Sequence, residues 1–325
     1  MSSHEIVGID VAAKTLAVAG DCPRLRAEYE NSREGRRGLV KALGGGRRPV
    51  RVVMEATGIY FLDAACELVA TGIAVMVVNP RASHHFAEAV LQRRKDDPVD
   101  AAMLRDYGQR MPFVPWLPPA ENHFALRAIG REVRAQGKAL SAAKNRLHAM
   151  GATRLVPREL VRALERQIAE TEALVDALVA AAVTLIDGDP ELKRKFQRTD
   201  SMPGFAAKAV VTVMGELIVL PPMSATQWTA QAGLDVREVR SGTSVKRPAR
   251  ISKRGNKRLR EALFYPALTA ARCCPQARAF VARLVARGKT PLQAQVALMR
   301  KLLHAIHALW KTDEDFDADK LFLNA

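Results

Sequence analysis

Short apolar runs rich in β-branched residues dominate the first 80 positions of the chain. The segments Glu5–Val11, Arg51–Glu55 and Ile73–Val78 have the composition of buried strands, and Lys14–Gly20 is typical of a partner strand for the first. Between the last two runs, the apolar positions of Tyr60–Thr71 recur at helical spacing. This strand–helix–strand order predicts a mixed sheet covered by helices.

The pattern becomes helical after this region. Helices are expected over about 81–92 and 98–109, and the proline-rich segment Met111–Pro119 then ends the helical pattern. From Glu121 to Ile186 the chain is rich in Ala, Leu, Arg and Glu, which predicts two long helices broken near 151–157, in an antiparallel or an intermolecular coiled coil.

A third, mainly helical region begins after Asp189-Pro190. It predicts helices over about 206–217, 257–272 and 291–310, with a strongly basic loop before the second of them. We therefore predict an α/β domain over 1–118, a helical coiled coil over 119–188 and a mainly helical domain over 189–325.

Composition places the chain among soluble globular proteins. Its 325 residues are 48% apolar and 26% charged, so neither a disordered chain nor a membrane protein is expected. No run of 18 apolar residues occurs, and Met1–Glu5 lacks the features of a signal peptide. The four cysteines show no CxxC spacing, which argues against a zinc site or a disulfide framework. A cytoplasmic protein is expected.

Charge narrows the class of partner. Fifty Lys and Arg against 34 Asp and Glu give a net charge of +16, which favours nucleic acid first and an anionic membrane surface second. Because only 5% of residues are aromatic, phosphate contacts are expected to outweigh base stacking. Ten of the 25 residues 236–260 are basic, and interruptions such as Ser241-Gly242 suggest a structured phosphate-facing loop rather than a solvated charge run. The segment 127–146 of the first long helix is also rich in Lys and Arg. The helix face that carries these residues is either solvated or lies on a phosphate backbone.

Four acids stand at the ends of predicted elements. Asp10 and Glu55 close apolar strands, while Asp97, as the N-cap before Pro98, and Asp100 begin a helix. Each alone is explained by a turn or a cap. Together, in a basic protein, they are expected to attract Mg²⁺, and two ions could activate an attacking oxygen and stabilise a leaving one in phosphodiester cleavage. Ser241 is a hydroxyl beside a flexible glycine and surrounded by cations in the sequence, where a turn residue or a donor of a hydrogen bond to phosphate is the simplest interpretation.

These motifs, in order and over nearly the whole chain, resemble those of the DEDD-type insertion-sequence transposases, the IS-one-ten family of bridge-RNA-guided recombinases. The N-terminal motifs are Gly8-Ile9-Asp10-Val11, Glu55-Ala56-Thr57-Gly58-Ile59-Tyr60, Asn79-Pro80 and Lys95-Asp96-Asp97-Pro98-Val99-Asp100-Ala101. The C-terminal motifs are Met202-Pro203-Gly204, Ala232-Gly233-Leu234, Arg240-Ser241-Gly242 and the segment 251–260.

The resemblance implies a RuvC-like N-terminal domain with a ribonuclease-H-like fold. It assigns Asp10, Glu55, Asp97 and Asp100 to metal binding and catalysis, with about two Mg²⁺ ions per composite site, and Ser241 to the nucleophile that becomes joined to DNA. It also implies a structured bridge RNA that pairs with donor and target DNA. The acidic site of a partner subunit would complete the active centre in a homo-oligomer, a dimer or tetramer associated with the nucleoid.

Two departures from the family pattern matter. Ala12-Ala13-Lys14 replaces the usual small-Lys-Asp run, and Asp96 stands where Thr is common, so that Asp96 competes with Asp97 for the metal. The downstream Asp100-Ala101 fixes the register on Asp97. The residues expected to bind nucleic acid are Arg131, Arg134, Lys138, Arg240, Lys246, Arg247, Arg250, Lys253, Arg254, Lys257 and Arg258.

Two other functions remain open from the sequence. One is a metal-dependent junction resolvase in which water attacks the DNA. The other is a nucleic-acid-binding protein without catalytic activity, whose acids are only caps and turns.

Overall fold

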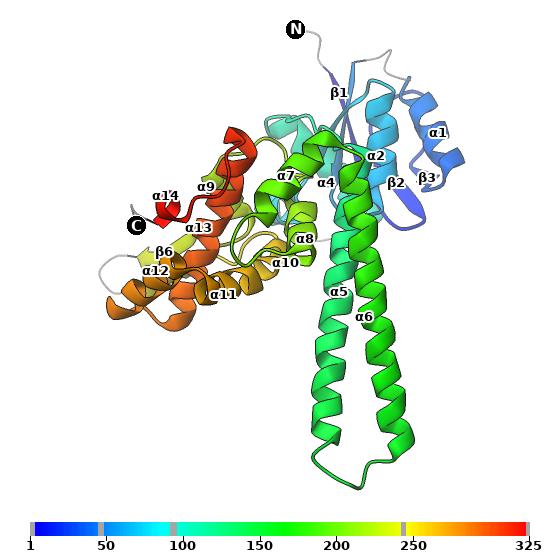
Figure 1. The fold of residues 1–325 in the computed structure, drawn as a ribbon. Helices are drawn as coiled ribbons and strands as arrows, with labels where there is room; N and C mark the ends of the chain where they lie inside the picture. Colours follow the sequence, from blue (N-terminus) through cyan, green and yellow to red (C-terminus); the bar gives the residue numbers. More distant parts are fainter. Residues whose placement is uncertain (1–3, 45–48, 92–95, 242–244, 323–325) are drawn as a thin grey trace. The chain divides into compact units, whose positions relative to one another are not determined.

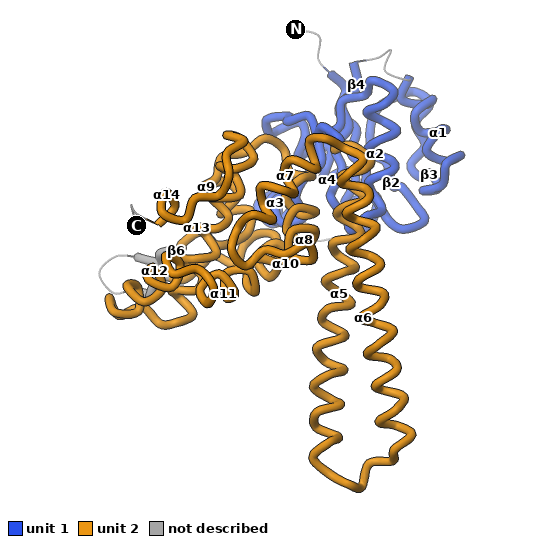
Figure 2. Tube along the Cα trace, in the orientation of Figure 1, with its two compact units in different colours: residues 1–118 blue, residues 119–325 orange. Residues whose placement is uncertain are grey.

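The computed structural model describes residues 4–44, 49–91, 96–241 and 245–322, with side chains for all of these except 238–241 and 245–249. Lys95, Gly242 and Ser244 therefore lie outside the described residues. The chain packs as two compact units, residues 1–118 and 119–325, which Figure 2 distinguishes by colour. The expected boundary at residue 188, which would separate the coiled coil as a third domain, stays a prediction.

The first unit is built on a five-stranded mixed sheet with the order β3-β2-β1-β4-β5. β1, β4 and β5 are parallel, and β2 runs antiparallel to both β1 and β3. The strands are β1 (Glu5–Val11), β2 (Thr15–Ala19), β3 (Glu28–Glu30), β4 (Val50–Glu55) and β5 (Ala74–Val78). The sequence therefore predicted four of the five strands, and it missed the short β3.

Helices cover both faces of this sheet (Figure 1). They are α1 (Arg33–Ala42), α2 (Phe61–Ala70), α3 (Pro80–Ala89) and α4 (Asp97–Arg110). Val52 and Met54 of β4 pack in one core with residues of α1 and α2, whereas Val53 packs in a second core with residues of α3 and α4. The two faces follow from the alternation of side chains along a strand.

Helix α4 lies directly against β1 because Gly8 has no side chain. A Cβ atom at Gly8 would lie 2.0 Å from the carbonyl oxygen of Ala101 and 2.4 Å from the backbone nitrogen of Arg105. Any larger residue would push α4 away from the strand. The glycine of the Val7–Asp10 motif thus sets how closely the start of α4 approaches the end of β1.

The second unit begins with a long antiparallel hairpin of α5 (Glu121–Met150) and α6 (Arg158–Asp187), seen in Figure 1. Its distal part has a small core of its own, made by Ala143, Leu164 and Ile168. Its other end contributes Leu126 and Ile186 to the main core of the unit. The two predicted helices and their break near 151–157 are confirmed, and within one chain the coiled coil is antiparallel.

The rest of the second unit is mainly helical. Eight of the 11 residues of α8 are buried, and α13 has ten buried residues, most of them in the core. The elements are α7 (Pro190–Asp200), α8 (Ala207–Leu217), α9 (Ala225–Gln231), β6 (Val236–Ser241), β7 (Val245–Ile251), α10 (Lys257–Ala262), α11 (Phe264–Cys273), α12 (Pro275–Ala286), α13 (Pro291–Thr312) and α14 (Ala318–Phe322). The N-terminal α/β region and the helical C-terminal part agree with the predicted fold classes.

Two predictions for this unit were wrong. The expected basic loop is the antiparallel hairpin β6–β7, whose charged side chains conceal the alternation of a strand. The single helix expected over 257–272 is two helices, α10 and α11, separated at Leu263, and α12 was not predicted. No helix in the described part of the chain is long and apolar enough to cross a membrane.

Candidate active site

Asp10 and Glu55 lie on the same face of adjacent parallel strands. Gly8 faces α4, so Asp10, two residues further along β1, faces the same side. Val53 packs with α3 and α4, so Glu55, two residues further along β4, also faces this side. The strand register pairs Ile9 with Met54, which brings the two acids to the same end of neighbouring strands. Such strands lie about 4.8 Å apart.

The N-terminus of α4 supplies the other two acids. The helix begins at Asp97, and Asp96 is its N-cap, since its carboxylate accepts a hydrogen bond from the Val99 backbone N–H at 3.0 Å. The expectation that Asp97 caps the helix was therefore wrong, because Pro98 occupies the second helical position instead of the first. Asp97 and Asp100 both lie in the first turn. Asp96 Oδ1 is thus used in the cap, and the assignment of the metal-binding acid to Asp97 stays a prediction.

The four acids act on one another electrostatically. Burial, followed by the negative charges of Asp100, Asp97 and Glu55, raises the pKa of Asp10 from 3.8 to about 6. Three of the causes of this shift are the charges of other carboxylates among the described residues, so the structure gathers carboxylate charge at this edge of the sheet.

The donor set suits a hard divalent cation. Carboxylate oxygens are the ligands that Mg²⁺ prefers, and a cation between these acids would relieve their repulsion. As the side chains stand, no three His, Cys, Asp or Glu residues in the described segments are placed to hold one ion together. The chemistry of the donors thus fits Mg²⁺, and the carboxylates would have to turn toward a common centre to ligate it.

Ser83 is a neighbour of Glu55 that the sequence analysis missed. Its fully buried hydroxyl lies 2.6 Å from Glu55 Oε2, and Thr57 Oγ1 lies 3.4 Å from Oε1. Ser83 belongs to α3, which Asn79 caps by accepting a hydrogen bond from the Arg81 backbone N–H. The Asn79-Pro80 motif thus starts the helix that orients Glu55. The available signal was a serine in the first turn after the Asn79-Pro80 motif.

Asn31 joins the two loops that follow the acidic strands. Its side-chain amide donates to the carbonyl oxygen of Ala12 at 3.0 Å and to that of Tyr60 at 3.1 Å. Ala12 follows Asp10, and Tyr60 follows Glu55, so this one side chain fixes the spacing of the two strand ends. The sequence analysis did not identify Asn31, which lies in a polar stretch between β3 and α1.

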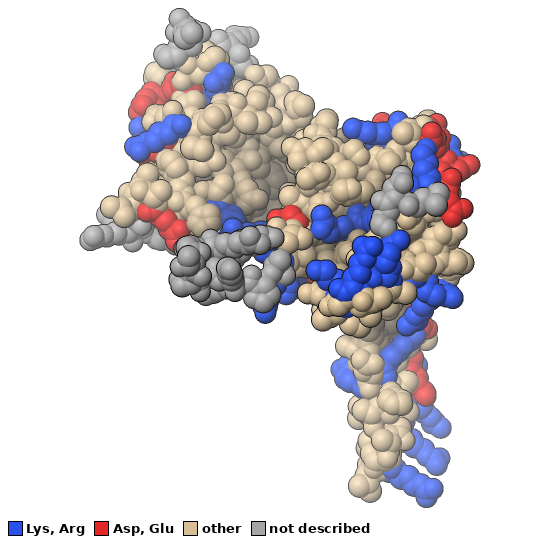
Figure 3. All heavy atoms as spheres, turned by 90° about the vertical axis from the view of Figure 1, so that its left-hand side faces the viewer, with Lys and Arg blue, Asp and Glu red and all other residues tan. Residues whose placement is uncertain are grey.

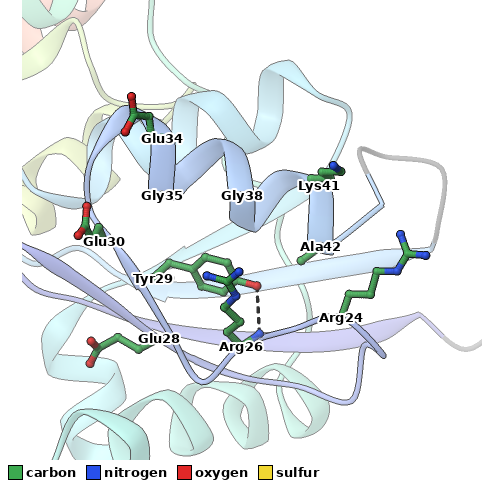
Figure 4. A pocket seen from close by; sticks show the side chains of 10 residues that line it. All are labelled: Arg24, Arg26, Glu28, Tyr29, Glu30, Glu34, Gly35, Gly38, Lys41 and Ala42. Carbon is green, nitrogen blue, oxygen red and sulfur yellow. Dashed lines mark hydrogen bonds between the residues drawn. The ribbon is translucent and has the colours of Figure 1, made fainter.

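A separate pocket of the first unit contains none of the four acids. It has a volume of about 480 Å³ and lies between β3 and α1, around Tyr29 (Figure 4). Its acids Glu30 and Glu34 lie toward one end in Figure 4, and Arg24 and Lys41 lie toward the other. The pocket is balanced in charge, and its lining residues are not among the causes of the raised pKa of Asp10. It is therefore not part of the proposed reaction.

Ser241 is the last residue of β6, where its backbone pairs with Val245. Its side chain, like those of Arg240, Lys246 and Arg247, lies outside the described residues. Ser252 is described, and its hydroxyl donates to Asp235 Oδ1 at 2.5 Å and accepts from the Arg254 backbone N–H at 3.1 Å. Those bonds give Ser252 a structural role in the turn after β7.

The motifs 232–234 and 252–256 form one bonded turn. Lys253 N donates to the carbonyl oxygen of Gly233 at 3.1 Å, and Asn256 N donates to that of Gln231 at 2.6 Å. Gly255 has a φ of +150°, and a Cβ there would lie 2.3 Å from the Gln231 oxygen. Asn256 also caps α10 by accepting from the Arg258 and Leu259 backbone N–H groups. The glycine and the asparagine thus fix where the basic side chains of this segment begin.

The cations predicted to bind nucleic acid fall into two groups. Arg250, Lys253, Arg254, Lys257 and Arg258 are exposed, and among them Lys257 lies 3.8 Å from Glu261 Oε1. In contrast, Arg131 makes two hydrogen bonds to Glu216, at 2.6 and 3.0 Å, and Arg134 and Lys138 both lie 2.7 Å from Glu261 Oε2. These three cations have intramolecular partners that compete with a phosphate.

Other cations extend the basic surface. Figure 3 shows Lys and Arg gathered in patches, which continue along the α5–α6 hairpin to its tip. Arg146, Arg154 and Arg158 are the exposed arginines near that tip. The sequence analysis identified the basic helix up to residue 146 but missed the later arginines.

Comparisons with known proteins agree with the sequence motifs. Residues 7–150 match a family model of DEDD-type IS110 proteins described as "Transposase", and residues 196–282 match one described as "Transposase IS116/IS110/IS902 family". The chain is also similar to pilin gene-inverting proteins of Moraxella bovis and Moraxella lacunata. Each is 26% identical over 325 residues, which cover 97% of this chain and 98% of the relative.

Proposed function

The chain belongs to the IS116/IS110/IS902 family of transposases and is a DNA recombinase, and from that premise we propose that it cuts and rejoins DNA through a covalent serine–DNA intermediate. The observation that carries the proposal is the gathering of Asp10, Glu55, Asp97 and Asp100 at one edge of the sheet, where burial and then the charges of the other three acids raise the pKa of Asp10. The strand order and the mixed sheet are consistent with a ribonuclease-H-like fold.

In this proposal Ser241 Oγ attacks a DNA phosphorus. Ser241 Oγ gives up its proton as the Oγ–P bond forms, the bond from phosphorus to a deoxyribose oxygen breaks, and that oxygen takes up a proton as it leaves, so no net proton is gained or lost. One phosphoester replaces another, so rejoining by the reverse attack needs no ATP. A serine hydroxyl is a weak nucleophile at neutral pH and must be activated. The cations beside Ser241 in the sequence would stabilise the negative charge that develops on the phosphate.

Asp10, Glu55, Asp97 and Asp100 would hold Mg²⁺, about two ions per composite site. A bound divalent cation supplies stabilisation of charge on the attacking and leaving oxygens. The chain's own part is to orient the carboxylates, through the Ser83 contact to Glu55 and the Asn31 link between the strand ends.

Partner molecules follow from the same family. We propose donor and target DNA as substrates and a structured bridge RNA that pairs with both, bound through the exposed cations of the β6–β7 region. A homo-oligomer, a dimer or tetramer, would combine the acids of one subunit with Ser241 of another. It would act on nucleoid DNA. The similar Moraxella proteins are named for gene inversion, which requires cutting and rejoining of DNA.

A covalent adduct with DNA is the test of the serine step. Ser241→Ala is expected to bind RNA and DNA as the wild type does, yet to form no protein–DNA adduct on a denaturing gel. Ser244→Ala and Ser252→Ala serve as matched controls and should still form it. Loss of a phosphate hydrogen bond alone weakens binding by only about 10- to 200-fold. An adduct in Ser241→Ala, or wild-type cleavage that leaves only free ends, would favour attack by water in a resolvase-type reaction.

A further inference from the structure

A pocket in the second unit lies beside the base of the β6–β7 hairpin, against α12 and α13. It has a volume of about 380 Å³, within the range of pockets that take small ligands. Ile251, Leu292 and Val296 are among the aliphatic side chains that form its floor. Leu292 is 63% exposed and Val236, also in the lining, is 53% exposed, so large apolar side chains remain in water here.

Four cations line the same pocket, namely Arg250, Lys253, Lys289 and Arg300, and none of the lining residues that the structure describes is acidic. Within the described segments, none of the four has a carboxylate within 4 Å, which distinguishes them from Arg131 and Arg134. A lining that combines four such cations with aliphatic side chains fits a ligand that is both anionic and partly apolar.

The rim is held in a defined conformation. Lys253 has a φ of +52°, in the left-handed region that a non-glycine residue rarely adopts. Its backbone N–H donates to the carbonyl oxygen of Gly233, and the neighbouring Ser252 is bonded to Asp235. At the start of α13, Thr290 and Gln293 form a capping box, and Gln293 belongs to the lining. Gln293 Oε1 is used in that cap, which leaves its amide N–H groups to face a ligand.

We propose that this pocket binds one unstacked nucleotide of a single nucleic-acid strand, with the base on the aliphatic floor and the flanking phosphates on the four cations. A single strand can turn a base out of its stack, whereas a paired base in a duplex is not available. None of the lining residues that the structure describes is aromatic, so we expect burial of the base face to hold it with little base preference.

Charge and position favour a nucleic acid over an acidic peptide. Arg250 and Lys253 belong to the basic run 236–260, which supplies most of the excess positive charge of the chain. The pocket thus continues the surface proposed to bind DNA and RNA. Its assignment to a nucleic acid rests on that part of the proposed function. Its chemistry is separate, because no strand is cut at the pocket.

The test uses the full chain and fluorescence anisotropy with labelled 20-mers of single-stranded DNA, single-stranded RNA and duplex DNA. Leu292→Glu places a charge on the floor at an exposed position, where folding should be unaffected. It is expected to weaken single-strand binding at least about 10-fold and duplex binding less than about 3-fold. Comparing the DNA and RNA strands identifies the source of the bound nucleotide.

The cations are tested by Lys289→Gln with Arg300→Gln in one variant. Loss of two phosphate contacts should make the slope of log K against log salt shallower by about 1.4 on single strands, at about 0.7 per contact. The variant Arg272→Gln with Arg278→Gln is the matched control. It removes the same charge from the same unit, and both of its arginines are exposed and lie outside the pocket lining. That control should leave the slope close to that of the wild type.

Equal losses for single strands and duplex in Leu292→Glu would overturn the proposal, as would binding unchanged from the wild type. A labelled Glu- and Leu-rich peptide can be tested in the same assay. If Leu292→Glu weakens binding of that peptide but has no effect on either single strand, the pocket is assigned to a protein instead. The adduct assay with Ser241→Ala separates the two claims. If no adduct forms in the wild type but the pocket variants behave as stated, the pocket stands and the serine reaction fails.

Discussion

At the sheet edge of the first unit, the charges that act on Asp10 are those of other carboxylates, whereas Glu216 and Glu261 of the second unit are surrounded by donors. Burial and the neighbouring acids raise the pKa of Asp10 to about 6. Burial also acts to raise the pKa of Glu216, but hydrogen bonds from Arg131 and Asn256 outweigh it, and the pKa is lowered. Hydrogen bonds from Lys138 and Arg134 lower the pKa of Glu261 to about 2.

The difference separates acids that serve the fold from acids that serve a ligand. Glu216 is almost completely buried and holds together α5, α8 and the residue that caps α10. Its charge is neutralised within the chain. Carboxylates that repel one another reduce the stability of the folded chain, and a bound cation reverses that effect. This contrast makes Asp10 and its neighbours the better candidates for chemistry, and variants of both groups of acids and their partners can break or sharpen it.

The largest effect is expected from the acids of α4. Asp97→Asn and Asp100→Asn should each lower the rate of DNA strand cleavage at least ~100-fold, equivalent to ~3 kcal/mol, because a metal-binding charge is lost. Asp96→Asn is the matched control. Asparagine caps a helix as well as aspartate does, so this variant should cleave at close to the wild-type rate. Cleavage lost in Asp96→Asn but kept in Asp97→Asn would move the metal ligand to Asp96.

A smaller effect is expected on the free energy of unfolding when a neutralised acid loses its partner. Arg131→Ala leaves the Glu216 charge buried without its main partner, and should cost about 2–4 kcal/mol. Arg134→Ala should cost about 1 kcal/mol or less, because Glu261 keeps Lys138 at 2.7 Å and Lys257 at 3.8 Å. Urea denaturation measures both. Equal costs for the two variants would contradict the distinction between the buried pair and the surface cluster.

Much of the acidic site followed from the sequence, for a physical reason. Strand ends are marked by the apolar runs before them, and the alternation along β1 and β4 places Asp10 and Glu55 on one face. The cap was misplaced by one residue because proline fits both the first and the second position of a helix. Ser83 was missed because its contact with Glu55 joins residues 28 positions apart, which no local pattern records.

The basic surface was harder to predict. A count of Lys and Arg does not show which of them have acidic partners, and the bond from Arg131 to Glu216 joins residues 85 positions apart. The β6–β7 hairpin was taken for a loop because arginines occupy positions that are apolar in most strands. The helix α12 was missed because Pro275 and a short apolar face gave no clear helical period.

The smallest effect is expected for Asp10→Asn, on the pH dependence of the free energy of unfolding. For Asp10 the folded-state pKa lies above the unfolded one, so the folded chain holds its proton more tightly. Stability is therefore lost as the pH rises from about 4 through about 6. At pH 7 the free energy of unfolding of Asp10→Asn should therefore exceed that of the wild type by about 1–2 kcal/mol, after allowance for partial exposure of Asp10 to solvent. The advantage should vanish below pH ~4.

Repeating that denaturation at pH 7 with and without Mg²⁺ tests the central claim most directly, namely that the acids of the first unit form a cation site. Mg²⁺ should raise the free energy of unfolding of the wild type, by an amount that grows with the logarithm of its concentration. Glu261→Gln should respond as the wild type does. Asp10→Asn, more stable at the start, should gain little. A wild type that does not respond to Mg²⁺, or an equal gain in Asp10→Asn, would contradict the account.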